Sequence, residues 1–256
     1  MVKRLLKVFV ALSIALSAFV IAGPATATAT PAGAAAGAGA GAADGCYTWS
    51  GSLAEGASGD AVRQLQIRVS GYPGSGSVLG LDGQYGPATT AAVKRFQQAY
   101  GLGADGVAGP ATFAKIYELQ DDDCTPVNFT YGELNQCNSD WSGGNVDAGT
   151  AKSNALVSMW KLQAMRHALG DVAISISGGF RSVACNNAVG GAADSRHLYG
   201  DAVDLVGSPS FCTLAQQARS HGFSMILGPG YPGHDDHTHV ANSASQFWSA
   251  PSCGIG

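Results

Sequence analysis

The stretch Gly233-His234-Asp235-Asp236-His237-Thr238-His239-Val240 holds three of the chain's six histidines and two carboxylates within eight residues. No other window of the sequence is as dense in titratable groups. Upstream, Ser195-Arg196-His197-Leu198-Tyr199-Gly200-Asp201-Ala202-Val203-Asp204 places one histidine seven residues before an aspartate. Neutral imidazole and carboxylate are ordinary zinc ligands, and three protein ligands with one open position form the catalytic arrangement. The two stretches together indicate a metal site.

The first 43 residues predict an export signal followed by a spacer. Three basic residues within the first seven precede the apolar run Val8 to Ile21, which has the length and the small-residue boundary of a signal peptide. The stretch from Ala25 to Ala43 is almost wholly Ala, Gly, Thr and Pro, a composition that cannot bury a core. No later run approaches the ~20 apolar residues that span a bilayer. We therefore expect a secreted or wall-associated protein, ordered from about Asp44 and without membrane contact after signal cleavage.

Charge and cysteine content narrow the classes of partner. Removing the three basic residues of the signal leaves 11 basic against 18 acidic residues, a net charge of −7. A nucleic-acid partner is not expected, because binding to phosphates calls for the opposite sign. All six cysteines lie in the exported part and none forms a Cys-x-x-Cys pair. In an exported protein this favours disulfides, although spacing alone cannot choose among 15 connectivities.

An internal repeat organises the segment from residue 44 to 124. Asp82 to Thr89 reads D-G-Q-Y-G-P-A-T, and Asp105 to Thr112 reads D-G-V-A-G-P-A-T. Each copy puts a proline at the expected first position of a helix, and apolar residues follow at helical spacing. A third amphipathic run covers Asp60 to Val69. The segment predicts a small all-α domain of three helices.

The same segment carries a resemblance to a known family. Gly-Asp-Ala-Val-x-x-Leu-Gln from Gly59, Asp-Gly-x-x-Gly-Pro-x-Thr from Asp82 and Ala-Val-x-x-Phe-Gln from Ala92 occur in that order. The pattern resembles the peptidoglycan-binding repeat domains of bacterial wall hydrolases and covers roughly Leu53 to Leu119. The resemblance implies peptidoglycan as a binding partner.

The second half, from residue 125 to 256, predicts an α+β domain with an antiparallel sheet. Polar Gln120 to Asp147 is interpreted as a solvated linker, and a long helix follows from about Thr150 to Leu169. Strands are expected at Val172 to Ser177, Ser224 to Leu227 and Thr238 to Asn242, with a helix from about Pro209 to Gly222. The strands and helices interleave without a regular βαβ period, which favours antiparallel pairing.

From the residues alone the site stays ambiguous. A hydrogen bond between His197 and Asp204 would explain their spacing as well as a metal does. Alternation in an extended segment puts His237 and His239 on the same side, so geometry does not decide which of them binds. Ser158-Met159-Trp160-Lys161 matches Ser-x-x-Lys of serine penicillin-recognising enzymes, but their Ser-Asp-Asn and Lys-Thr-Gly motifs are absent and the match is interpreted as chance.

A second resemblance resolves the ambiguity. His-x-x-Gly-x-Ala-x-Asp followed later by acid-x-x-His is similar to the zinc D-alanyl-D-alanine peptidases, relatives of lysostaphin and hedgehog, and most of all to the secreted carboxypeptidases of actinomycetes. It implies zinc ligands at His197, Asp204 and His239. Asp236 would be the general base, although the family often has the longer glutamate there. His234 and His237 would line the pocket, and Arg181 would face the substrate.

The resemblance and the domain layout also imply disulfides. Cys46 and Cys124 bracket the repeat domain, so that bridge would leave Cys137–Cys185 and Cys212–Cys253 for the second domain.

The function expected is that of a secreted, monomeric zinc carboxypeptidase that removes the terminal D-alanine from peptidoglycan stem peptides. One alternative is an endopeptidase that cleaves cross-bridges with the same chemistry. Another is a non-catalytic wall-binding protein whose metal is structural, with His237 as the fourth ligand of a closed site. The presence of Asp236 argues against the closed site, since a structural metal needs no base.

Overall fold

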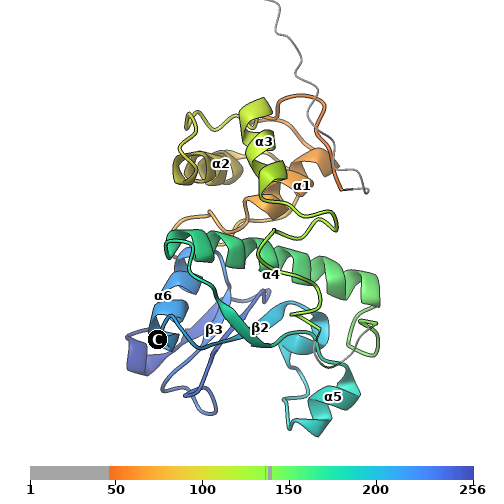
Figure 1. Cartoon of the computed structure of the whole chain (residues 1–256), viewed down its shortest axis with the longest axis vertical. Helices are drawn as coiled ribbons and strands as arrows, with labels where there is room; N and C mark the ends of the chain where they lie inside the picture. The colour runs from red at the N-terminus through yellow and green to blue at the C-terminus, as the bar shows by residue number, and fades with distance from the viewer. Residues whose placement is uncertain (1–45, 136, 138–139) are drawn as a thin grey trace, which may run out of the picture. The chain divides into compact units, whose positions relative to one another are not determined.

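A computed structural model describes residues 46–135, 137 and 140–256 of the chain (Figure 1). The predicted signal peptide, the Ala/Gly-rich leader and the expected start at Asp44 lie outside the described residues. Within the described part, no helix combines the length and apolar character needed to cross a membrane.

The predicted three-helix domain is confirmed in α1 (Asp60–Arg68), α2 (Pro87–Ala99) and α3 (Pro110–Glu118). A proline opens both α2 and α3, where its missing N–H has no intrahelical partner to lose. The helices bury a common apolar core, which includes Val62, Leu65, Tyr85, Ala92, Val93, Phe96, Phe113 and Ile116.

The sequence repeat is also a repeat of hydrogen bonds. Buried Gln66 of α1 donates from Nε2 to Asp82 Oδ1 (2.9 Å), and its Oε1 accepts from the Gly83 N–H (2.8 Å). Gln97 of α2 does the same with Asp105 Oδ1 (2.9 Å) and Gly106 N–H (2.9 Å). In each copy the glutamine also reaches the threonine of the following helix, at 3.1 Å. One buried amide thus ties each Asp-Gly turn to the helices on either side.

The second domain is built on a five-stranded sheet with strand order β1-β2-β4-β3-β5. The strands are β1 (Ser175–Gly178), β2 (Ala202–Val206), β3 (Met225–Leu227), β4 (Thr238–Ala241) and β5 (Phe247–Ser249). The α+β class is confirmed, and three of the four strand pairs are antiparallel as expected, while β5 runs parallel to β3. Met225, at the start of β3, lies opposite Ala241 at the end of β4 and opposite Phe247 at the start of β5. The short connection from β4 to β5 therefore crosses the start of β3. Because β5 begins beside the start of β3, the two strands run in the same direction.

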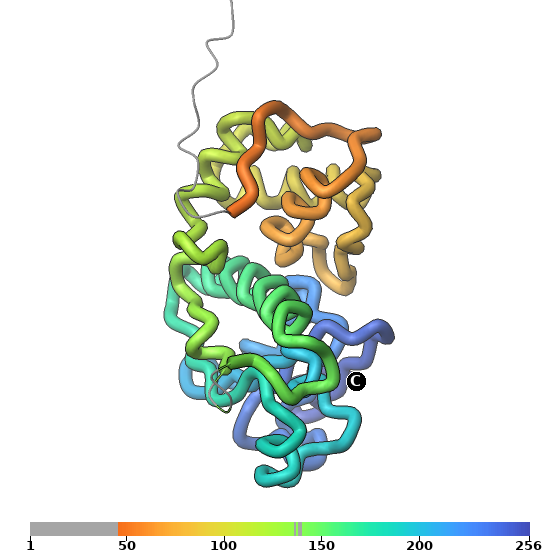
Figure 2. Tube along the Cα trace, turned by 90° about the vertical axis from the view of Figure 1, so that its right-hand side faces the viewer, coloured from red at the N-terminus to blue at the C-terminus, as the bar shows by residue number. Residues whose placement is uncertain are grey.

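Helices α4 (Ala148–Ala168) and α6 (Phe211–Ser220) cover one face of the sheet, and short α5 (Val183–Ala188) lies beyond β1 (Figure 1). The core between helices and sheet includes Met159, Leu162, Val203, Leu205, Leu214, Ala215, Ile226 and Val240. The other side of α4 supplies Trp160 and Ala164 to the core of the N-terminal helices, and Figure 2 shows α4 between these helices and the sheet. Apolar residues on two sides of α4 are therefore buried.

The interpretation of residues 120–147 as a solvated linker is only partly right. Asp121, Asp122 and Asp123 are exposed, as expected. Further along, Phe129, Leu134 and Trp141 are buried in the core of the second domain. These three large apolar side chains stand among polar neighbours and do not recur at helical or strand spacing, so the sequence pattern did not reveal their burial.

All three predicted disulfides are confirmed. Cys46 pairs with Cys124, Cys137 with Cys185, and Cys212 with Cys253. Each of the six cysteines is thus paired within its own predicted domain.

Gln97→Ala should lower the free energy of unfolding by about 1–3 kcal/mol, because it leaves buried partners of the amide unsatisfied. The matched control is Gln98→Ala, which removes an exposed glutamine from the same helix and should stay within about 0.5 kcal/mol of wild type. Urea unfolding monitored by circular dichroism measures both. Equal effects of the two substitutions would contradict a structural role for the buried amide.

Candidate functional site

Three buried side chains converge on the sheet face opposite α4 and α6. His197 lies on the 3-10 helix η1 (Arg196–Tyr199), Asp204 on β2 and His239 on β4. Asp204 and His239 are direct partners in the antiparallel pairing of β2 with β4, so both side chains leave the same face of the sheet. One potential ligand atom from each of the three residues lies within 4.8 Å of the other two.

The geometry of the three groups suits a cation. His197 Nδ1 lies 2.6 Å from the Gly179 carbonyl, which can only accept, so the neutral ring presents the lone pair of Nε2. That nitrogen lies 3.1 Å from Asp204 Oδ1, and His239 Nδ1 lies 2.8 Å from the same oxygen. Burial lowers the pKa of His239 and favours the neutral ring that a metal requires. Two imidazoles and a carboxylate are a donor set for zinc with room for a further ligand.

Arg181 completes the surroundings of Asp204. Its guanidinium Nη2 lies 2.7 Å from Asp204 Oδ2, the oxygen turned away from the histidines. Burial by itself raises the pKa of Asp204, but the adjacent imidazoles of His197 and His239 outweigh it and hold the pKa well below its usual range. The carboxylate is therefore ionised at neutral pH.

Small residues are required at the fixed positions of the first motif. Gly200 ends η1 with φ of 75°, and a Cβ there would lie 2.4 Å from the Ala151 carbonyl oxygen of α4. Ala202 is fully buried opposite Ala241 in the sheet. Between His197 and Asp204 the backbone thus passes so close to α4 that only small residues fit.

A pocket of about 540 Å³ opens over the three side chains. Polar residues on one part of its lining include Arg181, Asp194 and Arg196, and apolar Met225, Leu227 and Tyr231 line another part. His234 and His237 also line it, with ring centroids 4.7 Å apart. Burial lowers the pKa of His234.

Asp236 lies on a bend just before β4, outside the regular strand. Its carboxylate is 90 % exposed, and Oδ1 lies 2.8 Å from His237 Nδ1. The other ring nitrogen of His237, Nε2, lies 3.7 Å from Asp204 Oδ1. Asp236 therefore reaches the three buried groups by way of His237.

Comparison with known proteins accounts for both halves of the chain. Residues 127–241 match the family model described as Peptidase M15, and residues 58–116 match the model of a putative peptidoglycan binding domain. The zinc D-Ala-D-Ala carboxypeptidase of Streptomyces albus G is 70% identical over 213 residues, which cover 83% of this chain and 84% of that protein. The chain belongs to the peptidase M15 family.

Two solved structures show partial similarity. A peptidoglycan-binding protein from Clostridioides difficile, in complex with glutamine hydroxamate, is 41% identical over 25% of this chain and 39% of that one, with a TM-score of 0.23. The Burkholderia AP3 phage endolysin is 30% identical over 42% of this chain and 36% of that one, with a TM-score of 0.24.

The seven site residues predicted from sequence lie together at one pocket of the M15 domain. Six line it directly, namely Arg181, His197, Asp204, His234, His237 and His239, and Asp236 contacts His237. Sequence reasoning missed the apolar wall of Met225 and Leu227. Both lie on a strand that was expected, but only the pairing of β3 with β4 shows that Leu227 is next to His239.

Gly178→Ala should disturb the M15 site without unfolding the domain. A Cβ at this position would lie 2.6 Å from Asp204 Oδ2 and 3.0 Å from Arg181 Nη2, and both atoms are at the ends of side chains that can move. We expect zinc affinity to fall about 10- to 100-fold, as for other changes to groups that orient a ligand. Competition with a chromophoric chelator measures it. Ser175→Ala, at an exposed position of the same strand, is the control, and unchanged affinity in Gly178→Ala would refute the expectation.

Proposed function

We propose that this protein is a secreted zinc D-alanyl-D-alanine carboxypeptidase that hydrolyses the terminal D-alanine from peptidoglycan stem peptides. The observation that carries the proposal is the buried His197–Asp204–His239 group at the base of an open pocket. Membership of the peptidase M15 family and the matching peptidoglycan-binding domain support the substrate class.

His197, Asp204 and His239 would hold the zinc ion. The donor set fits, because two neutral imidazoles and an ionised carboxylate converge with their lone pairs facing one another. Zinc bound there supplies Lewis-acid chemistry, which polarises a carbonyl and makes water more acidic. Three protein ligands leave a position open toward the pocket, as catalytic sites require and closed structural sites do not.

Arg181 and the Asp236–His237 pair have separate roles in this proposal. Arg181 lies at the pocket wall, held by Asp204, and its remaining donors can bind a carboxylate or a developing oxyanion of the substrate. Asp236, expected from sequence to be the base, would act by holding His237. Its carboxylate accepts from His237 Nδ1–H, so Nε2, the nitrogen nearer to Asp204, can take a proton from the attacking water. The proton can then pass from Nε2 to the leaving amine.

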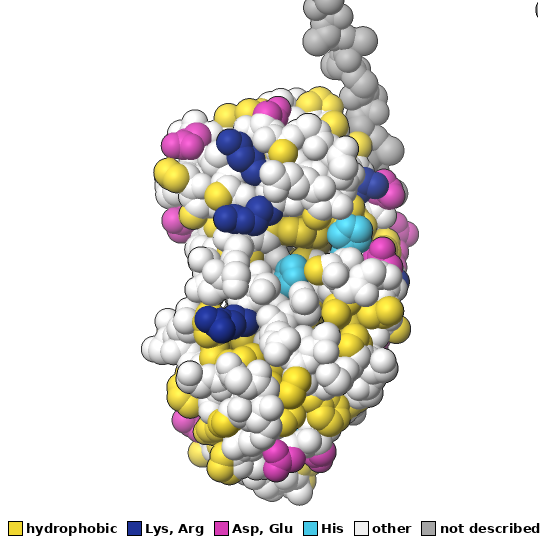
Figure 3. Space-filling model, turned by 90° about the vertical axis from the view of Figure 1, so that its left-hand side faces the viewer, with side chains coloured by type: hydrophobic (Ala, Val, Ile, Leu, Met, Phe, Trp, Pro, Cys, Tyr) yellow, Lys and Arg dark blue, Asp and Glu magenta, His cyan; other side chains and the backbone are white. Residues whose placement is uncertain are grey.

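The N-terminal domain would hold the enzyme on the polymer that contains its substrate. In Figure 3, basic side chains on the visible face of the described part are separated by uncharged surface, so no continuous basic patch for nucleic acid is present there. Peptidoglycan is the proposed partner, and the protein is expected to act as a monomer, outside the cell and without membrane contact after signal cleavage.

The direct test uses purified protein on a tripeptide ending in D-Ala-D-Ala and on cross-linked muropeptide, each with and without a chelator. We expect release of D-alanine from the tripeptide, its loss on chelation and its return with added Zn²⁺. Cleavage confined to the cross-linked substrate would favour the endopeptidase alternative. Zinc-loaded protein that cleaves neither substrate would favour a wall-binding protein with a structural metal.

The Asp236–His237 pair provides a second test. Asp236→Asn and His237→Ala should each keep about one zinc per chain and lower kcat/KM by about 10²- to 10⁴-fold, the usual contribution of a general base. Because the two groups act as a unit, the double variant should lose little more than either single variant. An Asp236→Asn variant that kept more than about a tenth of the wild-type kcat/KM would place the proton transfer elsewhere.

A further inference from the structure

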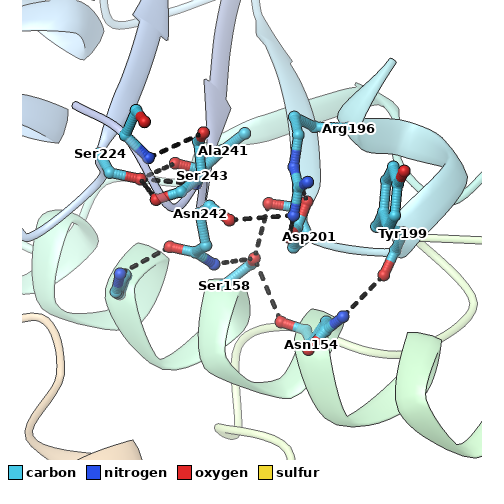
Figure 4. A network of polar contacts seen from close by, with 11 residues as sticks. Asn154, Ser158, Arg196, Tyr199, Asp201, Ser224, Ala241, Asn242 and Ser243 are labelled. Atoms are coloured by element: carbon cyan, nitrogen blue, oxygen red, sulfur yellow. Dashed lines mark hydrogen bonds and ion pairs between the residues drawn. The ribbon is translucent and has the colours of Figure 1, made fainter. Parts of the chain in front are cut away.

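A polar network centred on Asn242 lies behind the proposed zinc ligands, on the α4 side of the sheet (Figure 4). Asn242 follows directly after β4. Its backbone N–H donates to the Asp201 carbonyl (3.0 Å), and its own carbonyl accepts from Arg196 Nη2 (3.2 Å). Its side chain accepts from Lys161 Nζ (2.6 Å) and donates to Ser158 Oγ (2.9 Å). One residue thus connects β4, the η1–β2 segment and α4.

Three members of the network each lie close in sequence to one proposed zinc ligand. Arg196 immediately precedes His197, Asp201 precedes Asp204 by three residues, and Asn242 follows His239 by three. Arg196 also forms an ion pair with Asp201, which spans the turn between η1 and β2. The positions of all three ligand-bearing segments therefore depend on contacts that meet at Asn242.

The opposite side of the network is a polar stripe on α4. Asn154, Ser158 and Lys161 are spaced i, i+4 and i+7, which places them on one face of the helix. Asn154 Nδ2 donates to the Tyr199 carbonyl at the end of η1 (2.9 Å), so this stripe contacts η1 as well as β4. Figure 4 shows Ser158 facing Asn242 and Asp201, and Asn154 facing Tyr199.

The network is costly to break because two of its charged members, Lys161 and Asp201, are buried. Lys161 is 3% exposed, and burial lowers the pKa of its amine to about 7. Apart from Asn242 Oδ1, its hydrogen-bond partner is the Gly222 carbonyl at 2.6 Å. Asp201 is 4% exposed. A buried amine that loses a partner costs more free energy than an exposed one, so these contacts resist rearrangement.

The network also explains Ser-x-x-Lys at residues 158–161 without a second active site. Ser158 is fully buried, so a substrate cannot reach its hydroxyl, and Ser158 and Lys161 meet through Asn242. The spacing of Ser158 and Lys161 on α4 brings both side chains within hydrogen-bond distance of the Asn242 amide.

We propose that Asn242 is a positioning residue for the zinc site, which sets the spacing of His197, Asp204 and His239 by fixing their three segments against α4. The inference rests on the proposed zinc function. Ligand groups must be held to within about 0.5 Å of their productive geometry, and residues that hold them typically affect metal affinity 10- to 100-fold.

The test measures the zinc dissociation constant of three variants by competition with a chromophoric chelator, at a temperature well below each Tm. Asn242→Ala should bind zinc about 10- to 100-fold more weakly. Asn242→Asp should recover most of the affinity, because a carboxylate accepts from Lys161 Nζ and from the Ser158 hydroxyl. Asn128→Ala is the matched control, since it removes another amide that bonds to α4, through Gln163 Oε1 at 3.1 Å, and it should keep wild-type affinity.

Unchanged zinc affinity in Asn242→Ala would overturn the proposal, and so would an equal loss in Asn128→Ala. If Asn242→Ala does not fold, Ser158→Ala provides the decision. It keeps Asn242 and removes the 2.9 Å bond to Asn242 Nδ2, together with the 3.4 Å bonds from the hydroxyl to the Asn154 and Asp201 carbonyls, and it must still weaken zinc binding more than Asn128→Ala does. Wild-type protein that fails to bind zinc would instead sink the proposed function, so the two failures are distinguishable.

Discussion

The structure of the site depends on the burial of one carboxylate, that of Asp204. Its side chain is 9% exposed, and an ionised group at that depth is tolerated only where partners compensate its charge. The strand pairing brings His239 to one oxygen, η1 brings His197 to the same oxygen, and the turn after β1 brings Arg181 to the other. The three partners come from three separate segments and Asp204 from a fourth, β2, so four parts of the second domain must fold together to assemble one site.

The ligand candidates could be predicted from sequence through the resemblance to zinc peptidases, which rests on a motif that local constraints fix. Gly200 is required by its positive φ and by its approach to α4, and it stands between His197 and Asp204 for that reason. The choice between His237 and His239 could not be made from alternation, which puts both on one side. In the structure β4 begins only at Thr238, so alternation does not extend to His237, and His239 alone lies opposite Asp204.

Features that depend on distant contacts escaped prediction for a physical reason. Prolines at the starts of α2 and α3 act within one helical turn and were visible in the sequence. The direction of β5 depends on which side of β3 the chain passes, and no local pattern records that. The burial of Leu134 and Trp141 likewise depends on surfaces far away in the sequence.

Helix α4 shows why a one-sided amphipathic pattern describes this fold incompletely. Trp160 packs into one core and Met159 into the other, so the helix has no continuous face for solvent along its middle. Its buried Lys161 lies beside the turn that precedes β3 and the residue that follows β4, and a buried carbonyl outside a strand ladder still requires a donor. Lys161 supplies that donor to Gly222, and an apolar side chain of the same length would leave the carbonyl unsatisfied. A lysine inside an apolar helix pattern is therefore a consequence of where the strands begin and end, which becomes known only when the sheet does.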